Sequence, residues 1–179
     1  MQNYNLEKAQ ISREFIIGTL NGLHDLKNEA LKILEKCGIK DPKKEEWHSF
    51  KLWLKFIEEL DKEIGPTRLY ILGTTILEND EMLSNYDLEK GLYFIDEFYQ
   101  KNHKDGNIGT FKLINFNNEN REAEMMSNTP YPCDFERGII MYVVDKFNPK
   151  NNKNLWVVHK DLKTCRKRGI DYCMYLIRW

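Results

Sequence analysis

Three cysteines in the C-terminal part of the chain have the residue type and spacing of a metal site. Cys165 and Cys173 flank a turn centred on Gly169, and Cys133 follows a Pro-Tyr-Pro segment at the start of an expected helix. A hairpin would bring the first two cysteines together, and the helix start could supply the third. Zinc takes four such ligands in a tetrahedron. The alternative is that these cysteines are small apolar core residues.

Two other kinds of thiol chemistry need to be weighed against a metal site. A Cys165–Cys173 disulfide would require an oxidising compartment. Cys133 precedes an expected helix, which can lower a thiol pKa, so a thiol enzyme or redox sensor with Cys37 as a distant partner is a further alternative. The chain contains no Gly-rich phosphate loop, zinc-protease motif or serine-hydrolase elbow. We therefore expect a protein that is not an enzyme.

Composition limits the class of protein. The 179 residues suit a single domain over 1–179, and 27 basic against 28 acidic residues give a net charge of -1. Such a balance does not favour a nucleic-acid partner. The short basic cluster at 166–168 reads as a solvated turn. The N-terminus is polar, and no apolar run approaches the ~20 residues of a membrane span, so we expect a cytoplasmic protein without a membrane span.

The elements that must position these residues divide into two halves. Apolar residues recur every three to four positions in the first half, which predicts helices at about 6–37, 45–64, 67–78 and 87–103. The second half predicts strands at 109–116, 121–127, 155–159 and 172–179 around a helix at 133–147. The predicted fold is α+β, with an N-terminal helical half packed on a C-terminal antiparallel sheet of order ββαββ.

Two segments resemble the 4-vinyl reductase-like domain, a family that includes aromatic-sensing input domains of transcription activators. One segment is Cys133 with Gly138 in the first turns of a helix. The other is Cys165-Arg166-x-x-Gly169-x-x-x-Cys173 before an apolar final strand. Together they cover about the last quarter of the chain. The implied fold is similar to that of haem nitric-oxide-binding domains and of vesicle-tethering transport-particle subunits, so fold alone does not settle function.

The resemblance implies a ligand set for the metal. In the aromatic-sensing members, three cysteines at these positions bind a structural zinc with a glutamate as fourth ligand. The corresponding position here is Leu162, which cannot bind a metal, and the nearest substitutes are Asp161 and His159. We expect His159 to complete a site with Cys133, Cys165 and Cys173, because three cysteines and one histidine form a common structural zinc set.

The resemblance also implies a small hydrophobic or aromatic ligand between the helices and the sheet. Candidate lining residues are Trp47, His48, Phe50, Trp53 and Phe94, although large aromatic residues are also ordinary core residues. Haem is the alternative ligand. His103, expected at an exposed helix end, would be the candidate to bind its iron. A third reading is a protein-interaction subunit without ligand. A homodimer or a regulatory protein partner would then carry the output.

Overall fold

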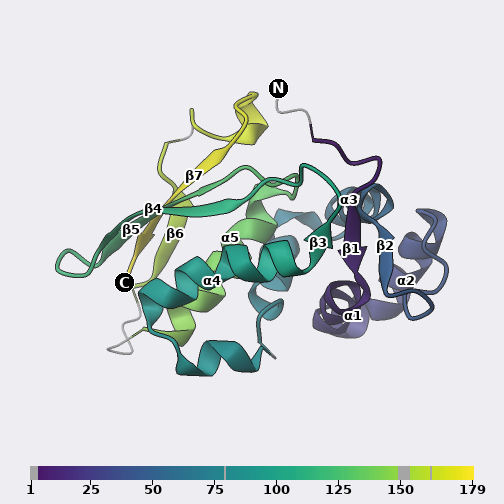
Figure 1. Ribbon diagram of the computed structural model, residues 1–179, viewed down its shortest axis with the longest axis horizontal. Helices are drawn as coiled ribbons and strands as arrows, with labels where there is room; N and C mark the ends of the chain where they lie inside the picture. Colours follow the sequence, from purple (N-terminus) through teal and green to yellow (C-terminus); the bar gives the residue numbers. More distant parts are fainter. Residues whose placement is uncertain (1–3, 79, 149–153, 162) are drawn as a thin grey trace.

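The computed structural model describes residues 4–78, 80–148, 154–161 and 163–179. It shows an α+β protein in which a helical half lies beside a four-stranded antiparallel sheet (Figure 1). The predicted fold class is therefore confirmed. No helix in the described part of the chain is long and apolar enough to cross a membrane.

The helical half contains a small sheet that the helical periodicity did not predict. Its elements are β1 (Gln10–Ser12), α1 (Arg13–Gly22), α2 (Lys27–Lys36), β2 (Trp47–Ser49), α3 (Phe50–Thr75), α4 (Leu88–Lys101) and β3 (His103–Lys104). The three short strands pair in the order β2-β1-β3. The helices predicted over 6–37 and 45–64 therefore begin later than expected, and the first is divided between α1 and α2. His103 lies in a strand rather than at an exposed helix end.

Local side chains explain where three of the helices begin. Ser12, Ser49 and Asp87 each accept a hydrogen bond from a backbone N–H in the first turn of α1, α3 and α4. The predicted helices over 45–64 and 67–78 are joined in α3 across a kink. Gly65 takes a φ of 76° at that point, and Pro66 cannot donate a backbone hydrogen bond. The kinked helix packs along α5 (Cys133–Lys146).

The C-terminal half has the predicted ββαββ order. It comprises β4 (Phe111–Asn117), β5 (Glu122–Ser127), α5 (Cys133–Lys146), β6 (Trp156–His159) and β7 (Cys173–Arg178). The sheet order is β4-β5-β7-β6, and every neighbouring pair is antiparallel. Cys173, Tyr175 and Ile177 alternate along β7 and are fully buried, as expected for strand residues that face a core.

Two glycines allow α3 and α5 to cross at close range. A Cβ added to Gly73 would lie 2.2 Å from the carbonyl oxygen of Phe135, and one added to Gly138 would lie 2.1 Å from that of Tyr70. No larger residue fits without moving the two backbones apart. The crossing fixes α5 against the helical half and places the first residue of α5 near the ends of β6 and β7.

Candidate metal centre

Four elements bring the predicted metal ligands together. Cys133 is the first residue of α5, His159 is the last residue of β6, and Cys173 is the first residue of β7. Cys165 precedes a single 3-10 turn over Arg166–Arg168. The chain then returns toward β7 through Gly169, whose φ of 84° suits glycine. Leu162, the position of the glutamate in the family that the sequence resembles, lies outside the described residues.

The spacing of the four side chains matches a tetrahedral site. The three Sγ–Sγ distances are 3.6 Å for Cys133–Cys165, 3.5 Å for Cys133–Cys173 and 3.7 Å for Cys165–Cys173. Nε2 of His159 lies 3.4 Å from Sγ of Cys165, and all four ligand atoms lie within 4.8 Å of one another. Zinc–sulfur bonds of about 2.3 Å in a tetrahedron require sulfur atoms about 3.8 Å apart. The donor set and its spacing therefore fit zinc.

The electrostatics of the cluster favour a thiolate. The hydrogen bond shared with Cys133 lowers the pKa of the Cys173 thiol, and His159 and the charge of Arg166 lower it further, while burial opposes them. The pKa of Cys133 is raised, chiefly by the same hydrogen bond and by burial. Metal binding requires deprotonated cysteines. The direction of this shift at Cys173 favours the form of the side chain that binds a metal.

A buried ion pair joins the same two segments as the cysteines. Glu136, on the first turns of α5, is fully buried and accepts a hydrogen bond from Arg166, which follows Cys165 in the chain. Tyr175 and Ser127 also donate to this carboxylate, both at 2.6 Å, and Thr129 donates a further bond. Burial raises the pKa of Glu136, while the Arg166 charge opposes the rise.

The ion pair corrects the interpretation of the basic cluster as a solvated turn. Arg166 is largely buried and also donates to the backbone carbonyls of Thr129 and Tyr131. Lys167 and Arg168 are exposed, and Lys167 forms an ion pair with Asp134, so the solvated reading holds for these two residues. The sequence held one usable signal for the pair, since Glu136 lies one helical turn after Cys133 and Arg166 lies next to Cys165.

A second buried polar cluster lies in the core between the two halves. Nδ1 of His103 lies 2.8 Å from the backbone oxygen of Tyr99, and its Nε2 lies 2.9 Å from the hydroxyl of Tyr131. A carbonyl can only accept, so Nδ1 carries the proton and Nε2 accepts from Tyr131. Nε1 of Trp53 donates to the same hydroxyl at 2.9 Å. Burial lowers the pKa of His103 to about 3, so the ring is neutral.

The surroundings of His103 do not fit a haem group. Nε2 is the ring nitrogen without a proton and is therefore the atom that could bind iron. It already accepts a hydrogen bond from the Tyr131 hydroxyl. The rings of Phe15, Phe50 and Tyr99 pack around the imidazole at centroid distances of 5.3, 4.6 and 4.3 Å. Iron coordination would require Tyr131 to leave this position.

The residues expected to bind a ligand fall into three places. Phe50 and Trp53 are fully buried beside Tyr131, whereas Phe94 packs against Tyr86 and Phe98. His48 lies in β2, with its Nε2 3.0 Å from the backbone oxygen of Pro42. Trp47, also in β2, is half-buried, and the ammonium of Lys104 lies 3.9 Å from its ring centroid. The structure does not gather all five around one cavity, and their role in ligand binding stays a prediction.

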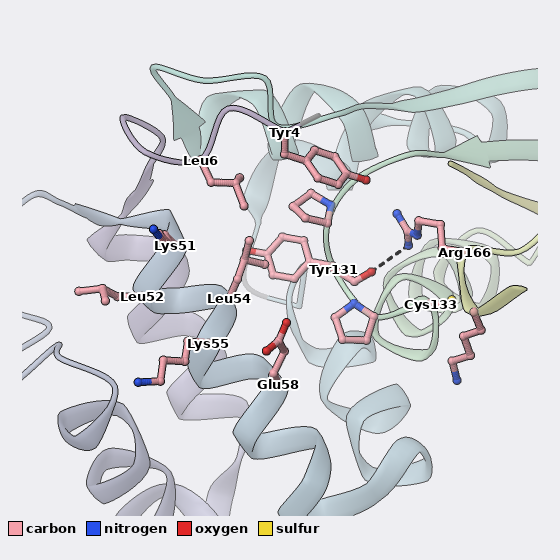
Figure 2. Close-up of a pocket in the computed structure, with 13 residues that line it drawn as sticks. Tyr4, Leu6, Lys51, Leu52, Leu54, Lys55, Glu58, Tyr131, Cys133 and Arg166 are labelled. Atoms are coloured by element: carbon pink, nitrogen blue, oxygen red, sulfur yellow. Dashed lines mark hydrogen bonds between the residues drawn. The ribbon is translucent and has the colours of Figure 1, made fainter. Parts of the chain in front are cut away.

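A large open groove adjoins the metal centre. Its volume is about 880 Å³, and it lies between the first turns of α3, the N-terminal segment at Tyr4 and Leu6, and the loop before α5. Figure 2 shows Tyr131 beside Leu54 in this groove, with Arg166 and Cys133 at one side. No local pattern predicts the groove, because its walls come from segments far apart in the chain.

Solved structures similar to this chain are haem nitric oxide/oxygen-binding (H-NOX) domains. A doubly substituted Tt H-NOX domain has a TM-score of 0.65 and 14% identity, covering 94% of this chain and 95% of its own. An oxygen-binding H-NOX domain related to soluble guanylate cyclases, as its oxygen complex, has a TM-score of 0.60, 15% identity and coverages of 93% and 94%. An Fe(II) H-NOX protein from S. oneidensis gives 0.58, 15%, 90% and 94%.

These similarities establish the fold alone, because all of the sequence identities are below 25%. No protein-family model matches the sequence, and no curated protein matches it significantly. The resemblance to 4-vinyl reductase-like domains and to vesicle-tethering subunits stays a prediction. The chain has the fold of H-NOX domains over almost its whole length.

Proposed function

We propose that this chain is a non-catalytic small-molecule sensor domain with the H-NOX fold and a structural zinc at Cys133, His159, Cys165 and Cys173. The observation that carries the zinc is the spacing of 3.5 to 3.7 Å between the three sulfur atoms, with a histidine nitrogen 3.4 Å from one of them. The whole-length likeness to H-NOX structures supports the sensor role.

The ligand set favours a structural metal over a catalytic one. Catalytic zinc sites keep one position open for water or substrate, whereas structural sites use four protein ligands. Three of the four residues here are buried and the fourth, His159, is half-buried. A zinc held by all four would have no free position for chemistry. It would tie α5 to β6 and β7.

Elemental analysis of the protein purified without added metal tests the proposal. We expect about one zinc per chain, removed by a strong chelator with a fall in the melting temperature, because the binding energy of a structural metal is folding energy. The Cys37→Ser variant is the matched control, since Cys37 is a buried cysteine that is not part of the cluster. Zinc-free protein with a melting temperature that chelator does not change would contradict the proposal.

Haem is the second candidate ligand. The H-NOX neighbours support it, although His103, the candidate iron ligand, is buried and its Nε2 accepts a hydrogen bond from Tyr131. It would make the chain a gas sensor and would require Tyr131 to move. Haem titration followed by absorption spectroscopy tests this candidate: a Soret band that His103→Ala abolishes would establish it. No band, or one unchanged by that substitution, would remove His103 as the iron ligand.

The output of such a domain would be a contact with another protein. The contact would be with a second copy of this chain or with a regulatory protein. A domain without a ligand would act through the same kind of contact. Sedimentation of the purified protein, with and without its ligand, distinguishes a ligand-dependent dimer from a monomer that needs a separate partner.

A further inference from the structure

We infer that the groove beside the metal centre binds a small organic cation, an ammonium group carried on an apolar body. The inference rests on the proposed small-molecule sensor function and names the class of its ligand. The groove holds about 880 Å³, within the ~300–1,000 Å³ typical of small-molecule sites. Its apolar wall and the charges around that wall select this class of ligand.

The apolar wall of the groove accounts for the body of the ligand. Leu54 and Tyr131 are buried side chains that line the groove, and Leu6, Pro130 and Pro132 continue the surface (Figure 2). Covering such a surface is favourable in proportion to the apolar area that is removed from water. A ligand with an alkyl or aryl body gains from this contact, whereas a small hydrated ion does not.

The four cations that line the groove do not face an anionic ligand. Three of them are already paired, as Lys51 with Glu7, Lys167 with Asp134 and Arg166 with Glu136. The fourth, Lys55, points away from the apolar wall (Figure 2). It faces Glu59, whose pKa is lowered by Lys62 and, more weakly, by Lys55. The wall therefore has no unpaired cation beside it in the part of the chain that the structure describes.

The charged group beside Tyr131 is the carboxylate of Glu58. It extends from α3 toward Tyr131 (Figure 2) and is exposed to solvent. Lys55, three residues earlier on the helix, would be its natural partner but faces Glu59 instead. Glu58 forms no ion pair with any described residue. An ammonium group on this carboxylate would place its apolar body along Leu54 and Tyr131.

The segment of α3 around Glu58 carries an excess of negative charge. Residues 58–63 read Glu-Glu-Leu-Asp-Lys-Glu, with four carboxylates and one ammonium group. Oδ1 of Asp61, one turn after Glu58, is buried and has no hydrogen-bond partner among the described residues. The pKa of Lys167 is raised by its hydrogen bond to Asp134 and, more weakly, by the charge of Asp61, so Asp61 lies near the groove. The potential at this end of the groove therefore favours a cation.

An inorganic cation does not fit the same place. Calcium and magnesium take about six to eight oxygen ligands, most of them from several carboxylates, carbonyls and waters. Glu58 is the single carboxylate among the described residues that line the groove, and the wall beside it is apolar. An ammonium group needs only one carboxylate and keeps its outer side in water, so it fits where a divalent ion does not.

Isothermal titration with three probes of similar shape tests the inference on the whole chain. The probes are phenethylammonium, neutral phenethyl alcohol and anionic hydrocinnamate. We expect phenethylammonium to bind best and the alcohol to bind about fivefold more weakly, which is the upper end for one ion pair at a surface. Hydrocinnamate should bind more weakly than the alcohol. Added salt should reduce the preference for the cation, because it screens exposed charges.

Glu58→Gln should remove the preference for phenethylammonium and leave the binding of the alcohol unchanged. Glu63→Gln is the matched control, because it removes the same charge from the same helix while Glu63 is exposed and does not line the groove. No binding of phenethylammonium, equal binding of phenethylammonium and the alcohol, or equal effects of the two substitutions would each overturn the inference.

The zinc content of each variant, measured in parallel, separates the groove from the metal centre. Zinc without binding of phenethylammonium contradicts only the groove site. Binding of phenethylammonium by zinc-free protein contradicts only the metal centre. Each proposal can therefore fail while the other is tested.

Discussion

The metal centre makes a quantitative prediction for Cys173→Ser. Cys173 is fully buried, and its sulfur lies 3.5 and 3.7 Å from the sulfur atoms of Cys133 and Cys165. Structural zinc contributes apparent binding energies of about 10–16 kcal/mol in zinc-finger peptides. Divided among four ligands, that is roughly 3 kcal/mol for each side chain. A buried thiol replaced by a hydroxyl costs about 1 kcal/mol for reasons unrelated to metal.

The measurement is urea unfolding of wild type and variant, each with zinc and with chelator. We expect Cys173→Ser to lower the free energy of unfolding by about 3–4 kcal/mol with zinc but only by about 1 kcal/mol in chelator. In a chain of this length each kcal/mol corresponds to about 2–4 °C, so thermal melts should show the same difference. Comparing the two conditions removes the packing cost common to both.

Cys37→Ser separates a ligand from an ordinary buried cysteine. Cys37 is as hidden from solvent as the cluster cysteines but lies outside the cluster. Its substitution should cost the same free energy with zinc and with chelator. If Cys173→Ser also costs the same free energy in both conditions, Cys173 is not a zinc ligand and its sulfur is only a core atom.

Three further predictions concern the helix crossing, the buried ion pair and the buried histidine. Gly138→Ala should lower the free energy of unfolding by about 1–3 kcal/mol through a clash with an α3 carbonyl, while Gly18→Ala, with open space around its Cα, should be neutral or stabilising by thermal melts. Arg166→Met should cost about 3–5 kcal/mol because it leaves the Glu136 carboxylate buried without its partner, and a second change, Glu136→Leu, should recover part of this loss in urea unfolding. Since the pKa of His103 is about 3 in the folded protein against an ordinary 6.5, only the unfolded chain takes up its proton between these values, so stability should fall as pH falls from about 6.5 to 3. The His103→Gln variant should lose less stability over that range, and an identical pH profile would contradict the burial argument.

The sequence predicted the structure correctly where residues close together in the chain determine the local conformation. The C-x3-G-x3-C pattern and the helix start at Cys133 predicted that these cysteines converge, and they do so in the structure, because a turn and a strand register decide which side chains meet. Alternating apolar residues likewise identified the strands of the large sheet. A zinc ion in the cluster is still a prediction.

The predictions for Trp47, His103 and Arg166 were wrong for a common physical reason, which is that long-range contacts decide where these residues lie. Trp47 continues an apolar helical period into α3, yet it lies in β2 because pairing with β1 satisfies its backbone. His103 looked exposed at the end of α4, but pairing of β3 with β1 turns its ring into the core. Arg166 looked solvated until α5 supplied Glu136. None of these partners lies near its residue in sequence.

The metal centre and the ion pair connect the same two segments of the chain. Removing zinc and substituting Arg166 therefore test two independent links between these segments. Both connect the start of α5 to the segment before β7, one through sulfur and the other through charge. Between them runs the loop at Tyr131, held by Arg166 on its backbone and by Trp53 and His103 on its hydroxyl. Release of zinc would leave the ion pair in place. The loop should therefore loosen without global unfolding, and hydrogen exchange at Tyr131 should rise on addition of chelator while exchange in the core of α3 stays slow.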